Sequence, residues 1–68
     1  MCIRDRSYTR RLFEDPTLLS AKMLEEAQEL TEAEQASEVA WEAADVLYFT
    51  LATLAQRGVP LSLSLIHI

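Results

Sequence analysis

Two pairs of acidic residues are the part of this sequence best suited to chemistry. The pairs are Glu26 with Glu29 and Glu42 with Asp45, each with two residues between its members. Side chains at this spacing share one face of a helix, so two antiparallel helices would bring the four carboxylates together. Such a group repels itself unless a cation lies within it, and oxygen ligands of this kind suit Mg2+ or Mn2+. The spacing therefore predicts half of a metal-dependent site for phosphate chemistry.

The ordinary interpretation of such pairs is a solvated helix face, because glutamate is a good helix former and acidic residues often repeat at this spacing. Three features count against that interpretation here. Acidic pairs recur on two consecutive segments, the second pair lies in the otherwise apolar stretch 39–54, and Asp45 is a poor helix former between apolar neighbours. A carboxylate in such surroundings is costly unless something pairs with it.

The first of the two segments has a clear helix start. Asp15 can cap free N–H groups, and Pro16 suits the first helical position, so we expect a helix over residues 16–35. The apolar stripe of this helix is expected to contain Leu19, Met23, Ala27 and Leu30. Glu26 and Glu29 then lie on an adjacent face.

The second segment is expected to form a helix over residues 38–57. Ser37 is the candidate N-cap, and Gly58 is a natural left-handed terminator. The apolar stripe is expected to be Val39, Ala43, Val46, Thr50 and Leu54, broadened by Leu47 and Leu51. Glu42 and Asp45 are expected on another face of this helix.

The two ends of the sequence do not fit this helical hairpin. Residues 1–12 are polar and basic without a clean period, which predicts a loop or a ragged helix start. Apolar and polar side chains alternate along residues 61–68, which predicts a strand. Because a single strand has no partner in an otherwise helical chain, the predicted fold class is all-α, an antiparallel helical hairpin.

Composition narrows the classes of function. The chain has 68 residues, enough for one small domain, and its formal net charge of −5 makes a nucleic-acid backbone an unsuitable partner. Cys2 is the only cysteine and His67 the only histidine, so a zinc set of these residues is excluded and a reducing compartment is indicated. A membrane span needs about 20 apolar residues in a row, and the sequence has no such run. We therefore expect a cytoplasmic protein that binds neither nucleic acid nor membrane.

Lys22 precedes Glu26 by about one helical turn. The ordinary interpretation is an exposed ion pair of little energetic consequence. The functional alternative is a contact with a phosphate group near the metal. Trp41 and Tyr48 are interpreted as packing residues rather than as a platform for a nucleotide base.

Several segments together resemble phosphoribosyl-ATP pyrophosphohydrolase, which belongs to the all-α, MazG-type nucleotide pyrophosphohydrolases. The segments are Ser7-Tyr8-Thr9, residues 22–30, residues 38–49 and Arg57-Gly58-Val59. The superfamily motif is an E-x-x-E on one helix and an E-x-x-D on the next, and both pairs match it. The acidic motif alone is specific only to the superfamily, whereas the Ser-Tyr-Thr element and Lys22 are more particular to the phosphoribosyl-ATP branch.

This resemblance implies an enzyme of histidine biosynthesis that hydrolyses phosphoribosyl-ATP to phosphoribosyl-AMP and pyrophosphate. It implies Mg2+, or Mn2+ in its place, held by Glu26, Glu29, Glu42 and Asp45. Lys22 would offset phosphate charge, and Glu25 or one of the ligand carboxylates would orient the attacking water. The alternatives are a MazG-type pyrophosphohydrolase of other nucleoside triphosphates and a non-catalytic helical hairpin that only dimerises.

The resemblance covers residues 7–59 and stops at both ends. Family members have a helix before the Ser-Tyr-Thr element and another after the Arg-Gly-Val element, and a MazG-like four-helix core is completed by these helices and by dimerisation. We therefore expect residues 7–59 to form a partial domain that is a homodimer in the intact protein. Residues 1–6 and 61–68 are expected to be non-native ends, and the 68-residue chain to have weak or no activity of its own.

Overall fold

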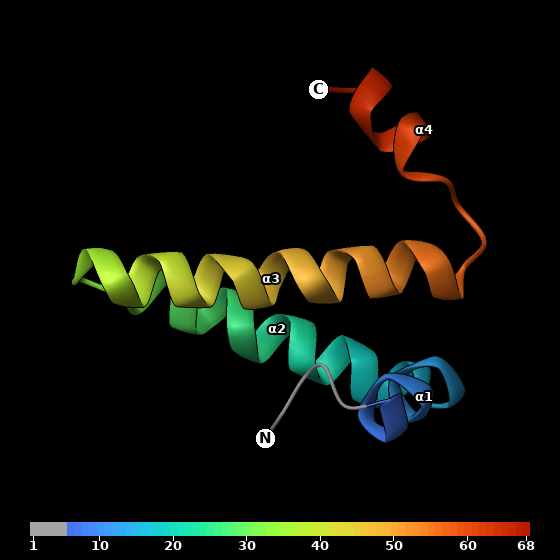
Figure 1. Cartoon of the computed structure of the whole chain (residues 1–68), viewed down its shortest axis with the longest axis horizontal. Coiled ribbons are helices and arrows are strands. Elements are labelled where there is room, and N and C mark those ends of the chain that lie inside the picture. Colours follow the sequence, from blue (N-terminus) through green and yellow to red (C-terminus); the bar gives the residue numbers. More distant parts are fainter. Residues whose placement is uncertain (1–5) are drawn as a thin grey trace.

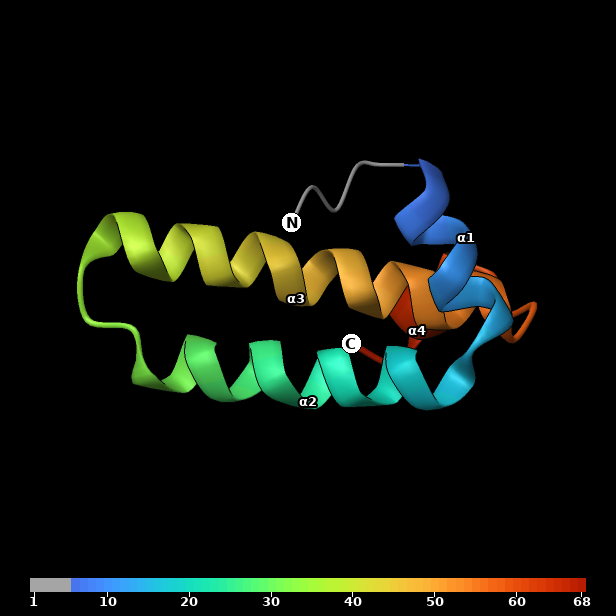
Figure 2. The ribbon, with the colours of Figure 1, turned by 90° about the horizontal axis from the view of Figure 1, so that it is seen from below.

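The computed structural model describes residues 6–68 and shows a helical hairpin with a shorter helix at each end (Figure 1). The helices are α1 (Arg6–Glu14), α2 (Pro16–Glu32), α3 (Ala36–Gln56) and α4 (Leu61–Ile66). Over the described residues all regular elements are helical, which confirms the all-α class. α2 and α3 lie side by side and antiparallel, and α1 packs across the end of the pair where α2 begins (Figure 2).

α2 begins as the sequence predicts. The backbone N–H of Leu18 donates to Asp15 Oδ1 at 3.1 Å, and Pro16 lies in the first turn, where its missing N–H costs nothing. The helix ends at Glu32 rather than at the predicted position 35, because Ala33 is already extended. Acidic side chains at the C-terminal end oppose the helix dipole, so the last predicted turn gains little from being helical.

α3 begins two residues earlier than predicted, and its N-cap is Gln35 rather than Ser37. The backbone N–H of Gln35 donates to Glu38 Oε1 at 3.5 Å, and this contact closes the first turn. At the other end Gly58 has a φ of 67°, the left-handed conformation expected of a glycine that terminates a helix.

The most buried face of α3 lies beside the predicted apolar stripe rather than on it. The core consists of Tyr8, Leu12, Leu19, Phe49 and Ala52, so α3 turns the side bearing Phe49 and Ala52 towards α1 and α2. Glu42 and Asp45 share this side by helical spacing. Of the predicted stripe, Val39 and Thr50 are exposed, whereas Ala43, Val46 and Leu54 are half-buried. Because α3 is apolar on most of its circumference, hydrophobic periodicity alone did not identify the buried face.

Residues 1–12 are predicted as a loop or a ragged helix start, and the described residues 6–12 belong to α1, so the helical alternative is the correct one for them; residues 1–5 lie outside the described part. Tyr8 and Leu12 are four positions apart, and both are buried in the core. The side-chain amide of Gln56 donates to the backbone carbonyls of Leu12 and Phe13 at 3.3 and 3.4 Å. These bonds satisfy carbonyls at the end of α1 that have no partner within the helix.

The predicted strand over residues 61–68 is wrong, since residues 61–66 form α4. A strand needs a neighbouring strand for its backbone groups, whereas a helix satisfies them internally. Accordingly, the backbone N–H of Leu63 donates to the carbonyl of Pro60 at 3.1 Å. α4 stands apart from the hairpin, on the side of α3 opposite α2 (Figure 1). Within residues 6–68, none of the helices combines the length and hydropathy that crossing a membrane requires.

Candidate metal centre

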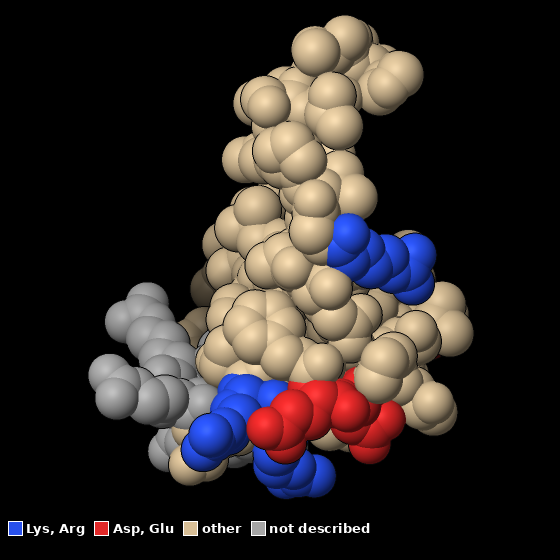
Figure 3. Space-filling model, turned by 90° about the vertical axis from the view of Figure 1, so that its right-hand side faces the viewer, with Lys and Arg blue, Asp and Glu red and all other residues tan. Residues whose placement is uncertain are grey.

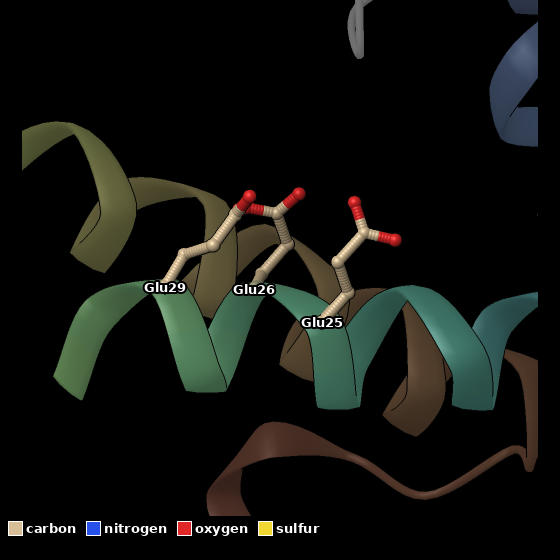
Figure 4. Close-up of side chains that lie close together, drawn as sticks. All are labelled: Glu25, Glu26 and Glu29. Atoms are coloured by element: carbon tan, nitrogen blue, oxygen red, sulfur yellow. The ribbon is translucent and has the colours of Figure 1, made fainter. Parts of the chain in front are cut away.

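Glu26 lies at the centre of a group of carboxylates contributed by both long helices. One oxygen of Glu26 lies within 4.8 Å of carboxylate oxygens from Glu42 and Asp45, and the same limit holds for Glu26 with Glu25 and Glu29. Glu25, Glu26 and Glu29 project from the same side of α2, and the carboxyl groups of Glu26 and Glu29 lie together (Figure 4). The structure thus brings the other three predicted ligands, Glu29, Glu42 and Asp45, around Glu26, with Glu25 beside them.

The register of the hairpin is fixed by apolar packing next to these carboxylates. Phe49 is one helical turn beyond Asp45 and is only 1% exposed, while Leu19 on α2 is 2% exposed. Because side chains of this size resist displacement from a close-packed core, α2 and α3 are held in one alignment. This alignment places Glu26, which is 9% exposed, opposite the half-buried Glu42 and Asp45.

The carboxylates strongly perturb one another. Burial raises the pKa of Glu26 to about 8, helped by hydrogen bonds with Glu29 and Glu42 and by the negative charges of Glu29 and Asp45. Burial also raises the pKa of Glu42; its hydrogen bond with Glu26 works against this, and the charges of Glu29 and Asp45 add to it. In the absence of a cation, the cluster therefore retains a proton at neutral pH.

The donor set fits a hard divalent cation. All the groups that converge here are carboxylates, and Mg2+ and Mn2+ prefer such oxygen ligands. One of these oxygens, Glu42 Oε2, is buried and has no hydrogen-bond partner within the described part of the chain. A buried acceptor without a partner is costly, and a bound cation would satisfy it.

Lys22 and Glu25, the two predicted catalytic residues, lie at the edge of the cluster and pair with each other. Lys22 Nζ is 3.4 Å from Glu25 Oε1, and the Lys22 side chain is 19% exposed. Burial lowers the pKa of Lys22, but the hydrogen bond and charge of Glu25, with smaller contributions from Tyr8 and Glu26, outweigh this, so the pKa is raised. Lys22 is therefore a cation held beside the carboxylates.

Two contacts between α1 and α3 lie next to the site and were not among the predictions from the sequence. Thr9 Oγ1 and the Tyr48 hydroxyl lie 2.7 Å apart in a hydrogen bond. The Tyr8 ring contacts Phe49 edge to face, with centroids 6.5 Å apart. Tyr8 and Thr9 belong to the Ser-Tyr-Thr element, whose residues in the sequence indicated the family but no structural role. The four-residue step from Tyr8 to Leu12 was the signal that this element lies on a helix with a buried face.

Comparisons with known proteins identify the family of this chain. A family model described as "Phosphoribosyl-ATP pyrophosphohydrolase" matches residues 4–65. The chain is 62% identical over 55 residues to the "Histidine biosynthesis trifunctional protein" of Saccharomyces bayanus, covering 81% of this chain and 7% of that protein. It is 50% identical over 56 residues to a "Histidine biosynthesis bifunctional protein" of Schizosaccharomyces pombe, covering 82% of this chain and 13% of that protein.

A plant relative shows the same relationship. The chain is 46% identical over 57 residues to a chloroplastic "Histidine biosynthesis bifunctional protein" of Arabidopsis thaliana, covering 78% of this chain and 20% of that protein. The chain thus spans a fifth or less of each of these three relatives. No solved structure matches it. Since the family model spans both acidic pairs and the helices that carry them, this chain belongs to the phosphoribosyl-ATP pyrophosphohydrolase family.

Proposed function

We propose that this chain carries the site at which phosphoribosyl-ATP is hydrolysed to phosphoribosyl-AMP and pyrophosphate in histidine biosynthesis. The observation that carries the proposal is the buried Glu26 among Glu29, Glu42 and Asp45, in a chain of this family. Buried carboxylates that repel one another are costly for a fold. Their presence on both helices of so small a domain is explained if they bind a cation.

Glu26, Glu29, Glu42 and Asp45 would hold Mg2+, or Mn2+, where it would neutralise charge on phosphate oxygens and lower the pKa of a bound water. The side chains at the edge of the cluster have their own roles. Lys22 would contact a phosphate oxygen, because its ammonium lies beside the carboxylates. Glu25 holds Lys22 in the free protein. Once a phosphate engages Lys22, Glu25 is free to orient the attacking water and to accept its proton.

The complete functional unit is proposed to be a homodimer. Large apolar side chains of α3 are exposed on the face turned away from the core: Leu47 is 64% exposed and Leu51 48%. The end view in Figure 3 shows acidic and basic side chains gathered over α1 and a broad, largely uncharged surface above them, interrupted by a basic side chain on the right. Exposed apolar surface of this kind is typical of an interface, and a second α3 would cover it. Sedimentation of the wild type and of Leu47→Lys tests this, because the variant should be monomeric.

The proposed extent of the domain is residues 7–59, with residues 1–6 and 61–68 as non-native ends. A continuous genomic read that encodes both ends intact would contradict this.

We place the protein in the cytoplasm, since its single cysteine suits a reducing compartment.

Pyrophosphate release in the presence of Mg2+ is the direct test. Phosphoribosyl-ATP and deoxynucleoside triphosphates are compared as substrates, because a preference for the latter would favour the alternative of a general MazG-type pyrophosphohydrolase. Glu42→Gln and Asp45→Asn should each abolish release, and Glu34→Gln should not, since Glu34 is exposed and outside both carboxylate groups. Near-normal turnover in either of the first two variants would refute the ligand assignment.

The assay is run on this chain and on a longer relative that carries the same two acidic pairs. Turnover by the 68-residue chain is expected to be weak, so the variants are compared in the relative. A non-catalytic hairpin is separated by a melting experiment. Mg2+ should raise the melting temperature of this chain in a concentration-dependent way if a metal site exists, and should not do so otherwise.

A further inference from the structure

α1 is joined to α2 by a single residue that holds the angle between the two helices. Asp15 lies between the last residue of α1 and Pro16, the first residue of α2. Its backbone N–H donates to the Arg11 carbonyl at 3.0 Å, and its carbonyl accepts from the Leu19 N–H at 3.1 Å. Because Pro16 also restricts the backbone of the residue before it, Asp15 has little freedom to bend. We call α1, Asp15 and α2 together the α1–α2 elbow.

The α1 arm of this elbow lies against α3 (Figure 2) and is attached to it at two separate points. Thr9 Oγ1 and the Tyr48 hydroxyl share a partly buried hydrogen bond of 2.7 Å. Nearer the end of α1, the Gln56 side-chain amide donates to the Leu12 carbonyl at 3.3 Å. Tyr48 and Gln56 are eight positions apart on α3, which is about 12 Å along a helix. Two attachments this far apart hold α3 both along its own axis and in rotation relative to α1.

The position of α3 decides how its acidic pair meets Glu26 on α2. Asp45 precedes Tyr48 by three positions, so the hydrogen bond to Thr9 holds α3 within one helical turn of this pair. The apolar core holds α2 and α3 together, but apolar contacts have no preferred direction and tolerate small shifts. A hydrogen bond, in contrast, weakens steeply when its partners move. Since Mg2+ accepts oxygen ligands only at about 2.0–2.1 Å, small shifts between the two helices matter for its binding.

We propose that the α1–α2 elbow aligns the two halves of the acidic site, and that Thr9, Tyr48 and Gln56 are its positioning residues. None of the three belongs to the carboxylate groups, so each acts through the place that it gives to α3. This inference rests on the proposed function, from which it takes the four carboxylates as ligands of one cation. Without the attachments, α3 would shift against α2, and the ligands of the two helices would seldom reach a suitable geometry together.

Mg2+ binding to variants that each change one hydroxyl group is the first test. Thr9→Val nearly keeps the shape of the side chain and breaks the bond to Tyr48, Tyr48→Phe breaks it from the side of α3, and Thr9→Ser retains it. Thr53→Val is the matched control, because the partly buried Thr53 hydroxyl donates within α3, to the Phe49 carbonyl at 2.8 Å. By calorimetric titration, the Kd of Mg2+ should rise about fivefold in Thr9→Val and Tyr48→Phe. Thr9→Ser and Thr53→Val should keep the wild-type value.

The alignment of the helices is measured separately, without Mg2+. Spin labels are attached through Leu24→Cys on α2 and Ala44→Cys on α3, both at exposed positions, in a chain that also carries Cys2→Ser. Dilution with unlabelled protein restricts the measurement to distances within one chain. Thr9→Val should broaden the distribution of distances between the labels, whereas Thr53→Val should leave it unchanged. A wild type that does not bind Mg2+ would overturn the proposed function, and the label distances would still decide whether α1 aligns the helices.

Three outcomes overturn the proposal. The first is a wild-type Kd of Mg2+ in Thr9→Val, and the second is a distance distribution in this variant as narrow as that of the wild type. The third is an equal rise of the Kd in Thr53→Val, which would show that any lost hydroxyl loosens the domain. If Thr9→Val fails to fold, Gln56→Met removes the other attachment at a similar side-chain length, and the same two results are expected from it.

Discussion

Replacement of Glu26 by glutamine should stabilise the cation-free protein and remove its response to Mg2+. Glutamine has nearly the same shape as glutamic acid and keeps its capacity for hydrogen bonds to Glu29 and Glu42, but it never carries a charge. The buried carboxylate, in contrast, must either hold a proton or repel its neighbours. The substitution therefore separates two properties of the cluster: the folding free energy that its buried carboxylate costs, and its capacity to bind a cation.

The magnitude follows from the pKa of Glu26, which is about 8 in the folded protein against an ordinary value of 4.5. Between these values the folded state holds a proton that the unfolded state has released. The stabilisation from this proton is complete below pH 4.5 and is lost as the pH rises towards 8, by about 1.4 kcal/mol per pH unit. At pH 7 the loss is on the order of 3 kcal/mol, and Glu26→Gln avoids it. For a domain of this size that corresponds to a melting temperature higher by about 10 °C or more.

The assay is urea unfolding followed by circular dichroism, with EDTA present, at pH 5 and at pH 7. The difference in free energy of unfolding between Glu26→Gln and the wild type should be small at pH 5 and large at pH 7. Taking this difference cancels the contribution of groups that do not interact with Glu26. Glu34→Gln, which removes an exposed carboxylate, should show no such pH-dependent difference. Equal stability of Glu26→Gln and the wild type at pH 7 would refute the reasoning, as would unchanged stabilisation of the variant by Mg2+.

Three further expectations test other parts of the structure. Mg2+ should bind more tightly as the pH rises from 6 to 8, by up to about tenfold per unit, because Glu26 must release its proton; a Mg2+ titration of the melting temperature measures this, and a flat profile would contradict it. Phe49→Ala should lower the free energy of unfolding by about 3 kcal/mol or more, since this ring is 1% exposed. Circular dichroism should then show a largely unfolded chain. Leu24→Ala, at an exposed site, is the control and should leave the chain folded. Gly58→Ala should lower the free energy of unfolding, measured in urea, by about 1 kcal/mol, because φ at this position is 67°. A Cβ at residue 58 would meet no atom within 4 Å among the described residues. A much larger loss would therefore contradict the backbone explanation.

The sequence was sufficient for the hairpin and for the acidic cluster because both depend on local patterns. Asp15 and Pro16 specify the start of α2 whatever surrounds it, and Gly58 ends the last turn after α3 by its own conformational freedom. The three-residue steps of the acidic pairs then place each pair on one helical face, and antiparallel packing brings the faces together. Only the last of these steps, the packing of α2 against α3, depends on contacts between residues distant in the sequence.

The errors lie where a distant contact decides the structure. α3 is apolar on most sides, so its own sequence cannot show which side faces α2. Phe49 and Ala52 are the buried residues because they pack against Leu19 and α1. Likewise the first residues of α1 have no clean period, and their helix is stabilised by Leu12 in the core and by Gln56, more than forty positions away. The pairing of Thr9 with Tyr48 has the same character.

The side of α3 that packs against α2 carries both apolar residues and carboxylates. A face that carried only apolar residues would be more stable, since charged groups gain little from burial. Here Phe49 and Ala52 supply the apolar contact at one end of the interface, next to α1, while Glu42 and Asp45 occupy the part opposite Glu26. The hairpin is thus divided into an apolar end that fixes the alignment of the helices and an acidic part that this alignment assembles. A cation that binds the acidic part would stabilise the half of the interface that the apolar residues leave weak.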